Sequence, residues 1–204
     1  MDKVSVEQEV EYVPFWEIDN TSRHLLSEKG GEHFYTPMSK AKHLYILQDI
    51  KRITTRLGLK LKWPPSPENQ HWEIPHLAYL YARRLGKEKL FFKKIHESRW
   101  IHGEDICSLE TVSRIAHECS LDGDLAANAY HQPSVREEAV AELMKAYEDG
   151  VFGIPFFVHG YSKFWGIDRF ELFLRSLRGE VQTPDSNTGS FLPYYETDHP
   201  GGCG

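Results

Sequence analysis

The chain has 204 residues, of which 40% are hydrophobic and 26% are charged, and its formal net charge is −6. This length and this apolar share are enough to bury one core, or one core together with a helical lobe. The acidic balance argues against nucleic acid as a partner, because no overall field attracts phosphate. Basic pairs such as Arg83-Arg84 are interleaved with apolar residues, as on a solvated helix face.

The start of the chain and its cysteines bear on the compartment. Residues 1–5 lack the apolar region of a signal peptide, and nowhere do about 18 uncharged apolar residues follow one another. Cys107, Cys119 and Cys203 are far apart and form no Cys-x-x-Cys pair. We therefore expect a cytoplasmic protein with no membrane partner and no structural disulfide.

The N-terminal part is predicted to be a strand followed by a polar connection. Val10–Trp16 is rich in β-branched and aromatic residues, and its Pro14 is typical of an edge or an end of a strand. A short helix is expected over Thr21–Glu28. From Pro37 onward the apolar residues recur at helical spacing until Gly58, which suits the position just past a helix.

A run of helices is predicted in the middle of the chain. The apolar spacing indicates helices over residues 75–85, 87–101 and 109–119, and Ser108 suits the N-cap of the last one. Helical signals alone occupy residues 38–132, between strand-like flanks, which indicates an insertion.

The C-terminal part carries the sharpest local signals. Ser134 and Glu137 form a capping-box pattern for a helix that ends at Gly150. The elements expected to follow are a strand over Val151–Val158, a turn at His159-Gly160, a strand over Lys163–Trp165 and a helix capped by Asp168. Residues 181–204 are rich in Pro, Gly, Ser and Thr and are expected to form a tail.

Pro155 lies inside an apolar strand pattern, where proline removes a hydrogen-bond donor from the ladder. Two interpretations stay open from the residues alone. Pro155 is an ordinary edge-strand proline, or it belongs to a cis-proline loop that leaves the backbone of Ile154 facing a cleft. In the second case the N–H and C=O groups of Ile154 can pair with a peptide-like ligand.

Three segments carry a resemblance to a known family. Gly150–Val158, with Gly-Ile-Pro-Phe-Phe at its centre, and Phe164–Arg169 together resemble the C-terminal signature of 2-hydroxychromene-2-carboxylate isomerases and kappa-class glutathione transferases. Lys42–Arg52 is similar to the first inserted helix of that family, and the resemblance spans residues 8–178.

The resemblance implies an α/β, DsbA-like thioredoxin fold with an inserted all-helical domain. The thioredoxin-like parts are expected at residues 1–36 and 133–180, the inserted helical domain at 37–132 and a tail at 181–204. Family members begin with a strand and a turn that carries Ser-Pro-x-Ser or a cysteine motif, and no such segment precedes Val10. Three explanations stay open: the native start lies upstream, the chain is a trimmed binding protein, or another segment fills the gap.

The resemblance also implies a cofactor, glutathione, and the residues that hold it. The backbone of Ile154, beside a cis Pro155, would pair with the cysteinyl part of glutathione. The resemblance places Ile167 and Asp168 where the family binds the γ-glutamyl group. From the residues alone, Asp168 is equally well suited to cap its own helix.

For the substrate, the resemblance implies that Lys42 holds an anionic group and that Trp72 forms a flat apolar wall. Trp72 stands where chromene-carboxylate isomerases often have asparagine, so a different substrate is expected. The implied activity is glutathione-dependent isomerisation of an unsaturated carbonyl compound, aromatic or polyketide-like, by reversible thiol addition, and a homodimer is left open. Two alternatives remain: a DsbA-type thiol–disulfide oxidoreductase, which needs a reactive cysteine motif, and a non-catalytic ligand-binding accessory protein of a biosynthetic pathway.

Other candidate groups are weak. His71 and His76 suggest metal ligands, but Pro75 breaks any helix that would place both imidazoles on one face, so no metal is expected. Cys119 falls on an apolar helical stripe and is expected to be a core thiol. The sequence offers no residue that we can name as catalytic.

Overall fold

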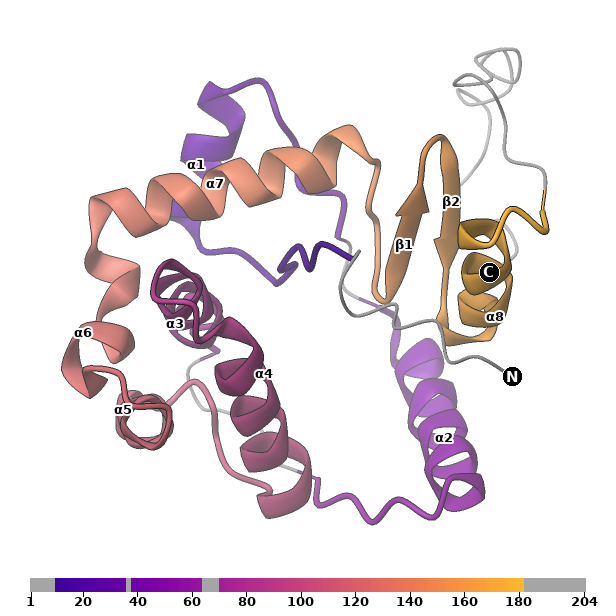
Figure 1. The fold of residues 1–204 in the computed structure, drawn as a ribbon, viewed down its shortest axis with the longest axis horizontal. Coiled ribbons are helices and arrows are strands. Elements are labelled where there is room, and N and C mark those ends of the chain that lie inside the picture. The colour runs from indigo at the N-terminus through magenta and orange to yellow at the C-terminus, as the bar shows by residue number, and fades with distance from the viewer. Residues whose placement is uncertain (1–9, 36–37, 64–69, 182–204) are drawn as a thin grey trace. The chain divides into compact units, whose positions relative to one another are not determined.

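The computed structural model describes residues 10–35, 38–63 and 70–181. The chain forms two compact units, Met1–Phe152 and Gly153–Gly204 (Figure 1). This division follows compactness alone, so the predicted domain boundaries stay a prediction. Apart from Val181, the predicted tail lies outside the described residues, and so does its cysteine. None of the helices in the described ranges is both long and apolar enough to cross a membrane.

The segment before the first helix is not the strand that the sequence predicts. Residues 10–19 contain no β-structure, and Trp16 is buried against the helices that follow. Two N–H groups of this segment donate hydrogen bonds to the carboxylate of Glu73, at the start of α3 (Glu73–Arg84). The Trp16 indole donates to it over 3.3 Å, and the Asp19 N–H donates to it as well. The apolar pattern therefore reflects packing onto helices and not pairing in a sheet.

The first two helices begin at side-chain caps. The Asp19 carboxylate accepts from a backbone N–H in the first turn of α1 (Asn20–Glu28), and the Ser39 hydroxyl does the same for α2 (Lys40–Arg56). After α2 the chain turns at Gly58, whose φ of 68° lies in the left-handed region that glycine adopts without steric cost. The predicted helices are confirmed here, although α2 buries none of its residues.

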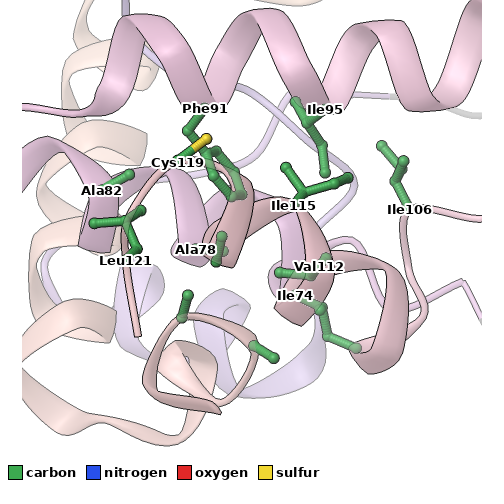
Figure 2. Packing of buried hydrophobic residues seen from close by; sticks show 13 residues of the cluster. Ile74, Ala78, Ala82, Phe91, Ile95, Ile106, Val112, Ile115, Cys119 and Leu121 are labelled. Carbon is green, nitrogen blue, oxygen red and sulfur yellow. The ribbon is translucent and has the colours of Figure 1, made fainter. Parts of the chain in front are cut away.

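A hydrophobic core joins α3 to the next helices of the first unit. These are α4 (Glu88–Glu97), the π-helical turn η2 (Ser98–His102), α5 (Leu109–Glu118) and α6 (Gly123–Ala127). Figure 2 shows Phe91 of α4 and Ile115 of α5 in this core together with Cys119, and all three are buried. Cys119 is thus the core thiol that its helical spacing predicts. The spacing also predicts α3, α4 and α5, whereas the short α6 is not predicted.

A second core lies between α1, α3 and α7 (Pro133–Glu148), which the 3-10 turn η3 (Ala129–His131) precedes. Its buried side chains are Trp16, Ile18, Leu26, Leu77, Leu80, Ala129, Val135, Ala139 and Leu143. This core explains why α7 can be a long helix of mixed polarity, since one stripe of apolar residues faces two other helices.

The start of α7 corrects the predicted capping box. Pro133 occupies the first turn, where its fixed φ suits a helix, so the helix begins before Ser134. The Ser134 hydroxyl accepts a hydrogen bond from Arg84 instead of capping the helix with Glu137. The predicted end is confirmed, because Gly150 has a φ of 66° just beyond the last turn.

The second unit is a hairpin with one helix. β1 (Phe156–His159) and β2 (Ser162–Trp165) are antiparallel, and together they form the whole sheet in the described part of the chain. α8 (Phe170–Leu177) covers the hairpin through Phe173, whose ring lies 5.0 Å from Phe157 and 5.9 Å from Phe164. β1 is shorter than the predicted strand, because its paired register with β2 begins at Phe156.

Candidate functional site

The turn that leads into β1 leaves the backbone of one residue unpaired. The Ile154–Pro155 peptide bond is cis, as the cis-proline interpretation of the sequence requires. The Pro155 carbonyl accepts from the Gly166 N–H over 2.9 Å, so the pairing of the hairpin reaches this residue. Among the described residues, the N–H and C=O groups of Ile154 have no hydrogen-bond partner, and Ile154 is 65% exposed. They offer one donor and one acceptor to an extended ligand.

The loop after β2 brings a carboxylate to the same place. Gly166 has a φ of 95°, and a Cβ built on it would lie 2.6 Å from Oδ1 of Asp168. Asp168 therefore folds back over Gly166, where a larger residue would collide with it. Its Oδ2 accepts from Arg169 over 2.7 Å, and both side chains are more than half exposed. Together, Ile154, Pro155, Gly166 and Asp168 form a proline corner.

Asp168 does not cap α8, contrary to one interpretation of the sequence. The 3-10 turn η4 (Ile167–Arg169) comes first, and α8 then begins without any side-chain cap. Because the extra turn shifts the helix start to Phe170, the Asp168 carboxylate does not reach the free N–H groups of α8. It remains at the proline corner, beside an exposed Ile167.

Trp165 borders the proline corner and is not predicted as a site residue. A Cβ at Gly153 would lie 3.1 Å from its indole nitrogen, which is tighter than an ordinary contact. Alternation along β2 could have identified it, since neighbouring strand residues point to opposite faces. Phe164 is 8% exposed and faces α8, whereas Trp165 is 38% exposed.

The two residues predicted for the substrate belong to the first unit. Lys42 lies in the first turn of α2, and its side chain is exposed. Trp72 directly precedes α3 and is partly buried beneath Arg99. The structure thus gathers Ile154, Pro155, Ile167 and Asp168 within the second unit, while Lys42 and Trp72 lie at different helices of the first.

The described cysteines do not have the character of nucleophiles. Burial, with the nearby Asp105 carboxylate adding to it, raises the pKa of Cys107 to about 12. Burial also raises the pKa of Cys119, and both thiols are buried and free. In the ranges that the structure describes, no group of His, Cys, Asp and Glu side chains is arranged to hold a metal ion.

Two groups with shifted pKa values, Glu73 and His76, contact Trp16 in the first unit. Burial raises the pKa of Glu73, whose carboxylate accepts from the Trp16 indole. Burial lowers the pKa of His76 to about 4. The His76 ring stacks on Trp16 at 5.1 Å, and its Nδ1 lies 2.6 Å from the Trp72 carbonyl. These groups hold the N-terminal segment to α3.

A hairpin and a helix that follow a cis-proline corner, with a helical region before them, are typical of a thioredoxin-like protein with a helical insertion. Residues 12–178 match the family described as DSBA-like thioredoxin domain. The chain belongs to this family, and its fold is the predicted one: thioredoxin-like with an all-helical insertion.

Known proteins similar to this chain agree with the resemblance seen in its sequence. A 2-hydroxychromene-2-carboxylate isomerase from Sphingobium xenophagum is 28% identical over 131 residues, which cover 64% of this chain. The chain spans 65% of the length of that relative. The solved structure of a selenomethionine 2-hydroxychromene-2-carboxylate isomerase (HCCA isomerase) matches with a TM-score of 0.60 and 18% identity. That match covers 78% of this chain and 75% of the other, and it shows a shared fold.

Proposed function

We propose that this protein binds glutathione at the proline corner and isomerises an unsaturated carbonyl compound. The observation that carries the proposal is the exposed backbone of Ile154, whose N–H and C=O groups have no partner among the described residues. The similarity to a protein named for an isomerase supports the same activity. A cytoplasmic location belongs to the proposal, because the free thiols of Cys107 and Cys119 and a thiol cofactor suit a reducing compartment.

The groups at the proline corner fit a γ-glutamyl peptide. The N–H and C=O of Ile154 can pair with the backbone of a cysteinyl residue, as an added strand pairs with a sheet edge. The Asp168 carboxylate suits the ammonium of the γ-glutamyl end, and Arg169 suits its carboxylate. Asp168 and Arg169 form an exposed ion pair, which stabilises the protein only weakly. Replacing this pair by contacts with the two charged groups of a ligand therefore costs little free energy.

Each residue has a role in positioning the reactants. Glutathione would supply the thiolate that adds reversibly to the unsaturated carbonyl compound, so that the double bond becomes single, rotates and re-forms on elimination. Backbone pairing at Ile154 would fix the cysteinyl segment, and Trp165 would border it with an apolar face. Lys42 would hold an anionic group, and Trp72 would form a flat wall for the substrate.

The redox alternative needs a thiolate on the protein. Cys107 and Cys119 do not supply one, since both are buried and burial raises the pKa of each. In the proposed isomerisation the sulfur belongs to the cofactor, so the burial of these thiols is no obstacle.

The Asp168 carboxylate provides the sharpest test of glutathione binding. Asp168→Asn should weaken binding by about tenfold or more in a calorimetric titration, since a hydrogen bond to a charged group contributes about 1.5–3 kcal/mol. Glu171→Gln is a matched control, because Glu171 is an equally exposed carboxylate in α8 that also pairs with an arginine. This control should bind glutathione as the parent does.

An altered ligand separates the specific contact from the general effect of charge. A glutathione analogue without the γ-glutamyl amino group should bind the parent and Asp168→Asn equally well. Absence of heat with millimolar glutathione would remove the glutathione assignment.

Turnover of 2-hydroxychromene-2-carboxylate and other unsaturated carbonyl compounds, with and without glutathione, then tests the isomerase activity. Binding without any turnover would favour the accessory protein.

A further inference from the structure

Arg99, in the π-helical turn η2, is a partly buried guanidinium that has no acidic partner within the described part of the chain. Among the described residues it forms no hydrogen bond or ion pair, and its Nη1 atom is buried with no partner. Burial lowers its pKa, and the nearby Cys107 and Asp105 oppose this only through space. A buried charge without partners is costly, so native proteins rarely keep one without a reason.

Other arginines of the same unit show what a satisfied guanidinium looks like. Arg83 donates to the carboxylates of Glu138 and Glu142 over 2.7 and 2.9 Å. Arg136 donates to the Asp19 carboxylate over 3.0 Å and is even less exposed than Arg83. The lack of a partner at Arg99 is therefore a local feature and not a property of arginines in this fold.

Indole rings flank the Arg99 guanidinium. Its Cζ atom lies 5.0 Å from the centroid of the Trp72 ring and 4.9 Å from that of Trp100. Trp63 adds a third indole, 5.5 Å from Trp100, and the Lys62 N–H donates to the Trp100 carbonyl over 2.8 Å. Aromatic rings attract a cation but do not accept its in-plane N–H groups. The indoles thus hold the charge and leave its hydrogen-bonding capacity unused.

One of these indoles, that of Trp63, borders an apolar and positively charged hollow. Trp63 is 53% exposed, and it borders a hollow of about 510 Å³ between α2 and residues 59–63. The lining combines apolar side chains with Lys51 and Lys60 and includes no acidic residue. This volume lies within the range of small-molecule sites.

We propose that the Arg99 cluster, formed by Arg99, Trp63, Trp72 and Trp100, binds a planar aromatic oxyanion. A carboxylate or phenolate of the ligand would accept the unused N–H groups of Arg99, since the guanidinium fork matches planar acceptors. The aromatic ring of the ligand would stack on an indole. The identification of this ligand with the substrate rests on the proposed function, whereas the binding itself does not.

Quenching of tryptophan fluorescence by 2-naphthoate measures this binding. The parent should bind 2-naphthoate at least about tenfold more tightly than neutral 2-naphthol, because only the first offers a charge to Arg99. Arg99→Gln should abolish this difference by weakening 2-naphthoate binding alone. Arg114→Gln removes an exposed arginine that is paired with Glu104 and Glu118, and it should leave both affinities unchanged.

A second variant separates a ligand site from a structural cation. Arg99→Met keeps most of the packing and removes the unpaired charge, so its Tm should equal or exceed that of the parent. 2-Naphthoate should raise the Tm of the parent and not that of Arg99→Met. The proposal is overturned if the parent does not prefer 2-naphthoate to 2-naphthol, or if both Arg99 variants bind 2-naphthoate like the parent. Glutathione is absent throughout, so failure here and failure at the proline corner are distinguishable.

Discussion

At the scale of single residues, the buried charges of this protein are stabilised in different ways. The Glu73 carboxylate accepts from the Trp16 indole and the Asp19 N–H, although burial still raises its pKa. Arg136 pairs with the Asp19 carboxylate. Arg99 has indole rings around it and no acceptor among the described residues. Because of this contrast, a ligand is the expected partner of the Arg99 guanidinium.

His76 should make stability depend on pH. Burial lowers its pKa to about 4, and the hydrogen bond from its Nδ1 to the Trp72 carbonyl only partly opposes this. A folded-state pKa below the unfolded value means that this stabilisation is fully present above about pH 6.5 and is lost as the pH falls toward 4. We expect a loss of up to about 3 kcal/mol in the free energy of unfolding, measured by urea denaturation across this range.

The matched variants isolate the contribution of His76. His76→Phe keeps a ring against Trp16 but has no group that titrates there. Its free energy of unfolding should therefore fall much less than that of the parent between pH 6.5 and 4. His43→Gln changes an exposed histidine of α2 and should retain the dependence of the parent. Equal slopes for the parent and His76→Phe would contradict the prediction.

At the scale of elements, polar side chains join helices that are distant in sequence. Arg136 of α7 donates to both carboxylate oxygens of Asp19, the residue that caps α1, over 3.0 and 3.1 Å. Arg83 of α3 bonds in a similar way to two glutamates of α7. These links lie beside the second hydrophobic core, and they fix which turns of the helices face one another.

Removing the Arg136 side chain should therefore loosen α1. Arg136→Met should lower the free energy of unfolding by about 2–3 kcal/mol, since it leaves the partly buried Asp19 carboxylate without its cation. Glu137→Gln, at the next and exposed position of α7, should change it by less than about 0.5 kcal/mol. Urea denaturation measures both, and equal effects of the two variants would show that the ion pair contributes little.

At the scale of the whole molecule, the candidate sites fall in different compact units. The second unit carries the proline corner, and the first carries the Arg99 cluster together with the buried Cys107 and Cys119. Since both cysteines are buried in the first unit, the rate at which their thiols react reports on how often that unit opens.

Thiol labelling tests this enclosure. In a Cys203→Ser chain, the remaining cysteines should react with a thiol reagent at least about a thousandfold more slowly than in the same chain unfolded in urea, because reaction requires opening of the fold. Burial, which raises the pKa of both thiols, acts in the same direction. Rapid labelling of either native thiol would revive the thiol–disulfide alternative.

Sequence patterns predict part of the fold because some elements carry their own signals. α2, α5 and α7 show apolar residues at helical spacing, and glycines with positive φ follow α2 and α7. The same reasoning fails at Val10–Trp16, where apolar residues suit a strand and a buried extended segment equally well. It also fails at Asp168, because an added 3-10 turn moves the start of α8 by a few residues.

By itself, the sequence determined the family and most helices, since these depend on residues that are close together in the chain, and it left open whether Pro155 belongs to a cis-proline loop. Only the tertiary structure decided that Trp16 bonds to Glu73 and that Arg99 lies against Trp72 and Trp100. The physical reason is that a partly buried indole or guanidinium can be satisfied by many different neighbours, and no local pattern specifies which of them the packing of helices will bring near.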